Sequence, residues 1–388
     1  MPTTYGFLST YPPTQCGLAT FNAALATHLT AGTPGAAIGS GVVRLLSQDN
    51  ASGGIALDRA APRIVHTWDT DRAGGWPGAA DTLNRYHVAI IQHEYGIYPG
   101  HAGAEVLPLL HALKVPAVVV LHTVLTNPDP QQRAVLEEIV DVAAAIVTMT
   151  DTARQRLTAN YVVNPRKITV IPHGAASHAG VPREDHDRPN LLTWGLLGPG
   201  KGIEWGLRAL ALLGDLRPAP VYTVAGRTHP KVIEHQGDVY RSSLVELAAE
   251  LGVTDSVRWV DAYLEPAELS RLIRSADAVV LPYDSTEQVT SGVLIEAVGA
   301  GIPVVATEFP HAVELLADGP GLLVPHQDPE AMALAIRHVL AEPGLPGRLA
   351  GLAGGPTLRW PAVAARYQAL AARLLADRAP LASATIPA

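Results

Sequence analysis

Thr290, Ser291 and Gly292 occupy the point where a polar loop passes into a stretch of helical spacing. Amides in the first turn of a helix have no acceptor within the helix, so the N–H groups of Ser291, Gly292 and Val293 could hold a phosphate. Glu296 follows about 6 Å further along the axis, at 1.5 Å per residue. A phosphate seat with a carboxylate one turn away suits a nucleoside diphosphate, because the carboxylate can accept hydrogen bonds from ribose hydroxyls.

A second candidate lies in the glycine-rich segment GLLGPGKG, residues 195–202. The stretch Gly195 to Lys201 fits the P-loop pattern G-x-x-x-x-G-K, but the next residue is Gly202, where that motif needs Ser or Thr for magnesium. The first interpretation is therefore an ATPase without its magnesium ligand. The second is that Lys201, at a strand-to-helix turn, neutralises a diphosphate.

Polar side chains also follow two apolar runs in the first half of the chain. His93 and Glu94 come directly after one run, and His122 follows the next. Ligands bind at the carboxyl ends of the strands in open parallel sheets, so these side chains are site candidates. The segment H-E-Y-G-I is not H-E-x-x-H, which disfavours zinc.

Apolar runs and helical patterns alternate along the whole chain, which predicts an α/β fold with parallel sheets. We expect strands at 5–9, 87–92, 116–121, 144–149, 167–172, 190–195, 221–225, 256–260, 277–282 and 303–306. We expect helices at 18–29, 233–251, 291–300, 310–317, 329–340 and 360–376. The first strand-to-helix turn contains Gly17 but lacks G-x-G-x-x-G, which disfavours a dinucleotide-binding dehydrogenase.

Length and periodicity suggest two domains. The predicted divisions are a first domain at 1–177, a linker at 178–189, a second domain at 190–358, a helix at 359–378 that packs on the first domain, and a disordered tail at 379–388. Residues 49–86 are polar, with weak periodicity, and we expect an insertion that shapes an acceptor site.

Composition excludes several classes of protein. The net charge of −8 and pI near 6.0 argue against nucleic-acid binding. The single cysteine, Cys16, fits a reducing compartment. No apolar run reaches the roughly 20 residues of a membrane span, and the N-terminus lacks signal-peptide features. These features predict a cytoplasmic protein, and they leave the oligomeric state open.

The segments TWGLLGPGKG, VAGRTHP, LPY, TSGVLIEA and GIPVVAT together resemble the retaining glycosyltransferases of family 4, in particular a mannosyltransferase-like bacterial subgroup. The resemblance implies the GT-B fold, in which two Rossmann-like domains face a central cleft and a C-terminal helix crosses back to the first. Family members carry two glutamates eight positions apart. Here Glu296 fills the second position, while Gln288, beside Glu287, stands at the first.

The resemblance also implies roles in donor binding. The loop that contains Gly17 faces the donor phosphates, and Tyr263 lies where the family packs the nucleotide base. The family's loop is usually G-R-L-x-x-x-K-G, so Lys201 matches and Leu196 replaces the arginine. Arg227 is a candidate substitute for that missing cation.

In the family, a histidine at the position of His122 lies by the donor sugar, and we assign His93 and Glu94 to the acceptor side. The implied reaction moves a hexosyl group from a nucleotide-diphosphate sugar to a hydroxyl of a sugar-containing or small-molecule acceptor. No metal or other cofactor is expected. A nucleotide-sugar epimerase and a non-catalytic nucleotide-sugar-binding protein stay open, and Asp69-Thr70-Asp71 keeps a metal-dependent D-x-D site as a minor alternative.

Overall fold

The computed structural model describes residues 2–32, 39–47, 61–317, 319–342, 344–352 and 355–378. The chain divides into two compact units. The first comprises Met1–Met149, Ala153–Pro172 and Trp360–Ala388, and the second comprises Thr150–Thr152 and His173–Arg359. The predicted tail 379–388 lies outside the described residues, as do 49–60 of the predicted insertion.

The first unit is built on a seven-stranded parallel sheet with the order β3-β2-β1-β4-β5-β6-β7. Its strands are β1 (Tyr5–Ser9), β2 (Gly41–Leu46), β3 (Arg63–Asp69), β4 (Val88–His93), β5 (Ala117–Leu121), β6 (Ala145–Thr148) and β7 (Ile168–Val170). This is the doubly wound Rossmann order, which reverses between β1 and β4.

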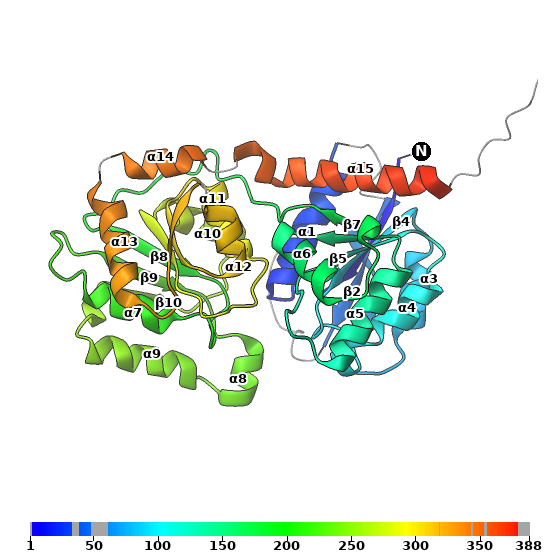
Figure 1. Cartoon of the computed structure of the whole chain (residues 1–388), viewed down its shortest axis with the longest axis horizontal. Coiled ribbons are helices and arrows are strands. Elements are labelled where there is room, and N and C mark those ends of the chain that lie inside the picture. The colour runs from blue at the N-terminus through cyan, green and yellow to red at the C-terminus, as the bar shows by residue number, and fades with distance from the viewer. Residues whose placement is uncertain are drawn as a thin grey trace, which may run out of the picture. The chain divides into compact units, whose positions relative to one another are not determined.

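Helices cover this sheet (Figure 1): α1 (Gly17–Thr30), α3 (Trp76–Leu83), α4 (Val106–Ala112), α5 (Pro130–Val142), α6 (Asp151–Asn160) and α15 (Trp360–Arg378). The C-terminal helix α15 packs beside α1 in this unit. Trp360 meets Phe21 edge-on at 5.2 Å between ring centroids, and Gln368 Nε2 donates to the Leu29 carbonyl at 2.9 Å. The last helix therefore belongs to the first unit, although the whole second unit precedes it in the chain.

The second unit repeats the same topology, with a six-stranded parallel sheet in the order β10-β9-β8-β11-β12-β13. Its strands are β8 (Asn190–Trp194), β9 (Val221–Ala225), β10 (Val257–Val260), β11 (Ala278–Leu281), β12 (Val304–Thr307) and β13 (Gly321–Val324). Its helices are α7 (Ile203–Ala211), α8 (Pro230–Gln236), α9 (Val239–Glu250), α10 (Pro266–Arg274), α11 (Gly292–Gly299), α12 (Pro310–Leu316), α13 (Pro329–Ala341) and α14 (Leu345–Leu352).

The strands form because their apolar runs can be buried on both faces, as parallel sheets require. Along β11, Ala278 and Val280 join one hydrophobic core, and Val279 and Leu281 join the core on the other face. The two units confirm the predicted α/β fold class of two Rossmann-like domains.

Two sequence predictions need correction. The helix expected over 233–251 is two helices, because Gly237 adopts φ 61° and ends α8 before α9 begins. The described part of 49–86 is no irregular insertion, since it contains strand β3 and helix α3. Strand β3 was hidden by its exposure: it is an edge strand that buries only Trp68 fully, so its apolar pattern is weak.

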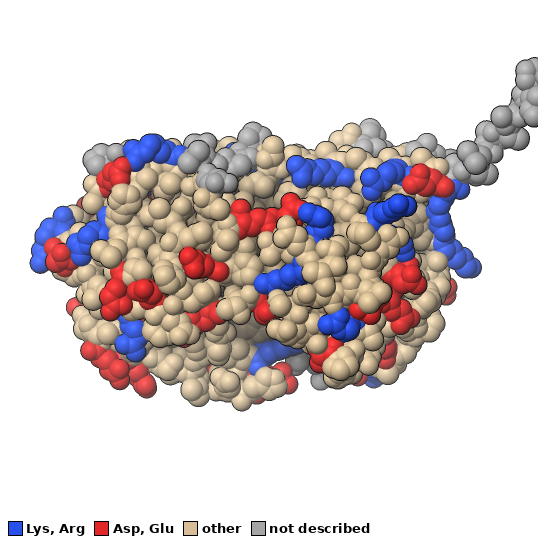
Figure 2. Space-filling view, in the orientation of Figure 1, with Lys and Arg blue, Asp and Glu red and all other residues tan. Residues whose placement is uncertain are grey.

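Figure 2 shows basic and acidic side chains interspersed over the visible face. Among the described residues, no helix combines the length and apolar character that a membrane span requires.

The loops after β8 and β9 touch through their backbones. Gly226, directly after β9, has φ 141°, and a Cβ added there would lie 1.8 Å from the carbonyl oxygen of Gly195. Leu197 N–H donates to the Arg227 carbonyl at 2.8 Å, which ties the same two loops. Only glycine fits at position 226, because the Cβ of any other residue would clash with the Gly195 carbonyl oxygen.

We therefore expect Gly226→Ala to lower the free energy of unfolding by about 3 kcal/mol, since the loops must move apart. Gly252→Ala is the matched control: Gly252, just after α9, also has positive φ, but a Cβ there meets nothing within 4 Å. Its cost should be the conformational strain alone, about 1 kcal/mol. Urea unfolding of both variants measures the difference, and equal costs would contradict the backbone contact.

Candidate functional site

The second sheet reverses its strand order between β8 and β11. Ligands of open α/β sheets bind in the crevice beyond the carboxyl ends of the strands at such a switch point. The glycine-rich segment 195–202 follows β8, and the loop 282–291 follows β11. Asp284 N–H donates to the Gly200 carbonyl at 3.0 Å, so these loops are in contact. The structure thus brings together the two stretches that sequence reasoning selected independently.

The start of α11 is arranged around two amides. Ser291 is the N-cap, and its Oγ accepts a hydrogen bond from Leu294 N–H at 3.2 Å. The N–H of Ser291 itself donates to Nδ1 of His311 at 2.7 Å. Within the described residues, the amides of Gly292 and Val293 have no hydrogen-bond acceptor. Two N–H groups at the positive end of a helix form a seat for a phosphate oxygen.

Two histidines that sequence reasoning passed over shape this helix start. His311 is buried, and because its Nδ1 accepts from Ser291, the ring is neutral with its proton on Nε2. Burial, together with the nearby His173, lowers the pKa of His311 to about 3. A Cβ on Gly292 would lie 3.0 Å from Nε2 of His173, so glycine lets this ring approach the helix. In the sequence, His173 directly follows the strand predicted at 167–172, and His311 lies at the start of the helix predicted at 310–317. Neither position by itself indicates a contact with α11.

Lys201 lies in the loop after β8, with its Nζ 4.2 Å from the ring centroid of Tyr283. This is a cation–π distance. No carboxylate of the described residues forms an ion pair with this ammonium group. Burial lowers the pKa of Lys201 to about 8. A half-buried ammonium group that has no carboxylate partner among the described residues is suited to bind an anion.

Arg227 and Tyr263 are the other residues of this sheet that are predicted to contact the nucleotide. Arg227 is exposed, and its carbonyl, not its guanidinium, holds the loop to Leu197. Tyr263 is half-buried in the turn between β10 and α10. Both side chains lie beyond the carboxyl ends of strands in the same sheet. Their contacts with a nucleotide stay predictions.

Glu296 lies one turn into α11, with 21% of its side chain exposed. Both carboxylate oxygens lie 3.1 Å from the Ala176 amide, which donates to them, and Oε2 lies 3.3 Å from Nε2 of His178. The carboxylate is therefore held by two groups from outside its own helix, while part of it stays exposed to solvent.

The loop before α11 carries the residues at the family's first glutamate position. Gln288 turns its Nε2 to the Thr290 carbonyl at 3.1 Å, and Glu287 beside it is half-buried. Thr290 Oγ1 is buried, and no described residue forms a hydrogen bond with it. Which of Glu287 and Gln288 contacts a sugar stays a prediction.

In the first unit, the two predicted histidines differ sharply. His93 is fully buried beside Tyr95 and Tyr98, and burial lowers its pKa to about 4. At the end of β4 the ring is thus buried in this structure, and its contact with an acceptor stays a prediction. His122 is half-buried, with Nε2 2.9 Å from Gln92 Oε1.

Glu94 and Gly17 also lie at the carboxyl edge of the first sheet. Glu94 accepts hydrogen bonds from Thr123 Oγ1 at 2.5 Å and from Tyr95 N–H at 3.1 Å. Gly17 is exposed at the first residue of α1, and a Cβ there would meet nothing within 4 Å. Open space at this glycine is compatible with the approach of a ligand.

The D-x-D alternative has a local explanation. Asp69 Oδ1 accepts a hydrogen bond from Asp71 N–H at 3.1 Å, and its Oδ2 pairs with Arg72 at 3.4 Å. In the part of the chain that the structure describes, no three His, Cys, Asp or Glu side chains are grouped as metal ligands.

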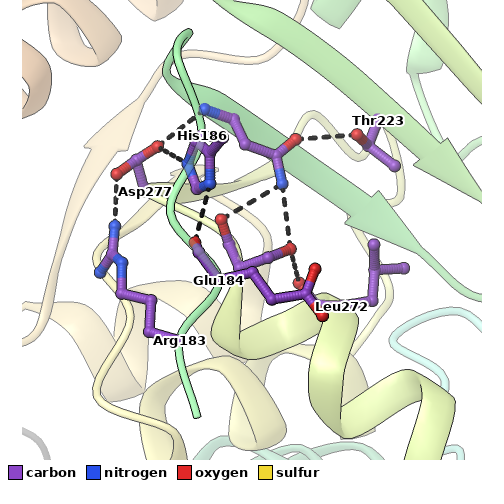
Figure 3. Close-up of polar contacts among 8 residues, drawn as sticks. Arg183, Glu184, His186, Thr223, Leu272 and Asp277 are labelled. Carbon is purple, nitrogen blue, oxygen red and sulfur yellow. Dashed lines mark hydrogen bonds and ion pairs between the residues drawn. The ribbon is translucent and has the colours of Figure 1, made fainter.

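A cavity of about 590 Å³ lies elsewhere in the second unit, at the amino ends of β8 and β9. The irregular segment 183–188 borders this cavity and contacts Asp277 (Figure 3). Arg183 forms an ion pair with Oδ1 of Asp277, and His186 Nε2 lies 2.8 Å from Oδ2. Because the strands are parallel, this edge is opposite to the one that carries Lys201. Residues 183–188 of the predicted linker thus pack on the second unit at the edge opposite to the candidate site.

Family models match both halves of the chain. Residues 188–342 match the model described as Glycosyl transferases group 1, and residues 54–176 match Glycosyltransferase Family 4. The chain belongs to the family-4 glycosyltransferases. The family resemblance predicted from the motifs is thereby confirmed.

Curated relatives of this family-4 glycosyltransferase include a D-inositol 3-phosphate glycosyltransferase from a Nocardioides species. It is 29% identical over 304 residues, which are 70% of this chain and 63% of that protein. A protein of the same name from Thermobispora bispora is 30% identical over 286 residues, 65% of this chain and 64% of that protein. The match thus spans slightly less than two thirds of these relatives.

Solved structures show the same fold at low sequence identity. Anabaena HepE in complex with UDP and glucose superposes with a TM-score of 0.77 at 14% identity, covering 96% of this chain and all of that one. Sucrose-phosphate synthase from Thermosynechococcus elongatus gives 0.72 at 19% identity, covering 97% of this chain and 100% of the other.

The lowered pKa of Lys201 predicts how nucleotide binding depends on pH. With a pKa of about 8, the ammonium is largely charged at pH 7 and largely neutral at pH 9.5. A bound diphosphate favours the charged form, so affinity should fall above pH 8 by up to about tenfold per pH unit. Calorimetric titration with a nucleoside diphosphate at several pH values measures this.

Lys201→Arg is the control, because a guanidinium stays charged over this range. Ionisation of the ligand affects both proteins equally, so the difference between them reports on Lys201. Parallel pH profiles for the wild type and the arginine variant would contradict a lysine–diphosphate contact.

Proposed function

We propose that the chain is a retaining glycosyltransferase. It moves a hexosyl group from a nucleotide-diphosphate sugar to a hydroxyl of a sugar-containing or small-molecule acceptor. One observation carries the proposal: Lys201 and the Gly292 and Val293 amides lie at the switch point of one sheet, with the Glu296 carboxylate one turn along the helix. That set of groups matches the diphosphate and ribose of a single ligand.

The chemistry of the leaving group explains this arrangement. When the glycosidic bond to the diphosphate breaks, negative charge develops on a phosphate oxygen. Preorganised cations and amide dipoles aimed at developing charge usually give the largest catalytic effect. Lys201 and the two amides supply this stabilisation, and exposed Arg227 can add to it when the donor binds.

Retention of the anomeric configuration follows from attack on the same face. The acceptor hydroxyl approaches from the side of the leaving group, and the departing phosphate oxygen takes its proton. No side chain is then needed as a base. His122, fixed by Gln92, orients the sugar and stabilises charge, and Glu94 contributes to the acceptor side.

We propose that no metal ion takes part, because Lys201 and the α11 amides already neutralise the diphosphate. Donor and acceptor are suggested by related proteins. HepE was solved with UDP and glucose, which supports UDP-sugars as the first donors to assay. The name of the curated relatives supports D-inositol 3-phosphate as the first acceptor. A cytoplasmic location stays a prediction from composition.

Lys201→Ala should lower turnover by at least about a hundredfold, the typical effect of removing one group that stabilises transition-state charge. Release of the nucleoside diphosphate from UDP-glucose and GDP-mannose, with D-inositol 3-phosphate or simple sugars as acceptors, measures turnover. Lys114→Ala is the control, since that exposed lysine lies in the first unit.

Unchanged turnover in Lys201→Ala would remove this residue from the mechanism. The same assay in EDTA should give full activity, and activity that returns only with added metal would contradict the metal-free proposal. Conversion of the sugar without acceptor would favour an epimerase. Donor binding without diphosphate release, for any acceptor, would favour a binding protein.

A further inference from the structure

The Glu296 carboxylate is held by groups from outside its own helix. The Ala176 amide donates to both oxygens at 3.1 Å, and Nε2 of His178 lies 3.3 Å from Oε2. Both residues belong to the segment that follows β7. The contact joins positions about 120 residues apart in sequence, so it is invisible to motif analysis.

His178 is itself fixed on its other side. Only 5% of its side chain is exposed, and Nδ1 lies 3.2 Å from Oγ of Ser270 on α10. The ring is therefore held between a hydroxyl and a carboxylate. With its proton on Nε2, the imidazole donates to Glu296 and accepts from Ser270, and every polar atom of the ring has a partner.

This arrangement leaves part of the carboxylate available. An ionised carboxylate has about four lone-pair positions. The Ala176 amide and His178 occupy part of these positions, while 21% of the Glu296 side chain stays exposed. A carboxylate whose rotamer is already fixed loses less conformational freedom when it binds a ligand. Two adjacent hydroxyls, as on a ribose, can then use the remaining positions.

We propose that His178 is a positioning residue for donor binding, which orients Glu296 toward the ribose hydroxyls of the nucleotide. This inference rests on the proposed function, because it needs a nucleotide at the switch point. His178 does not contact the ligand. It acts through Glu296 and is supported by Ser270.

The test is the penalty for removing the ribose hydroxyls. We would titrate UDP, GDP and ADP, and their 2′,3′-dideoxy counterparts, into each protein by calorimetry. The wild type should prefer the ribose form of its nucleotide by about tenfold or more, as expected for hydrogen bonds to a charged group. In His178→Phe this preference should fall below about threefold, because the carboxylate loses the imidazole and keeps only the Ala176 amide.

Three comparisons separate positioning from a general loss of structure. His178→Gln keeps an N–H donor and should restore most of the ribose preference. His235→Phe makes the same substitution at an exposed histidine on α8 and should match the wild type. Affinity for inorganic pyrophosphate, which has no ribose, should be the same in all variants. A general loss of structure would lower it in His178→Phe.

Each other outcome overturns the inference. A ribose preference of about tenfold in His178→Phe would show that Glu296 needs no positioning. If His178→Phe does not fold, Ser270→Ala decides: a ribose preference equal to that of the wild type contradicts the proposal. A wild type that binds nucleotides without ribose preference removes the role of Glu296. A wild type that binds none of these three diphosphates, and no dTDP either, removes the proposed function itself.

Discussion

Close backbone contact between the loops at the carboxyl edge of the second sheet is the constraint on which the candidate site depends. A Cβ on Gly202 would lie 1.7 Å from the Pro282 carbonyl oxygen, just as one on Gly226 would meet Gly195. The loops after β8, β9 and β11 therefore have one arrangement. That arrangement puts the Lys201 ammonium over Tyr283 and leaves the first amides of α11 open.

The electrostatics of the site follow from this packing. Lys201 is half-buried and no carboxylate of the described residues pairs with it, while burial lowers the pKa of both His173 and His311 and keeps them neutral. The positive charge is thus concentrated on one side chain and on two amide dipoles. Under the proposed function, a diphosphate supplies the counter-charge.

Sequence reasoning succeeded where the pattern is local. Buried strands read as apolar runs, and a helix that begins at Ser291 and Gly292 is visible from residue types alone, so the fold and the start of α11 were predictable. It failed where position depends on distant contacts. The burial of His93, the ring of His173 against Gly292 and the bond from His178 to Glu296 all join residues that no spacing rule connects. A break at Gly237 was also missed, because glycine at positive φ ends a helix without changing the hydrophobic pattern.

The central claim is that the switch point of the second sheet binds a nucleoside diphosphate. The most direct measurement is a thermal-shift screen of the purified protein against UDP, GDP, ADP, dTDP, NAD and Mg-ATP. A ligand at 100 times its Kd should add about 2.7 kcal/mol of stability, so one diphosphate should raise the melting temperature clearly. Stabilisation by NAD or Mg-ATP alone, with no response to any diphosphate, would contradict the account.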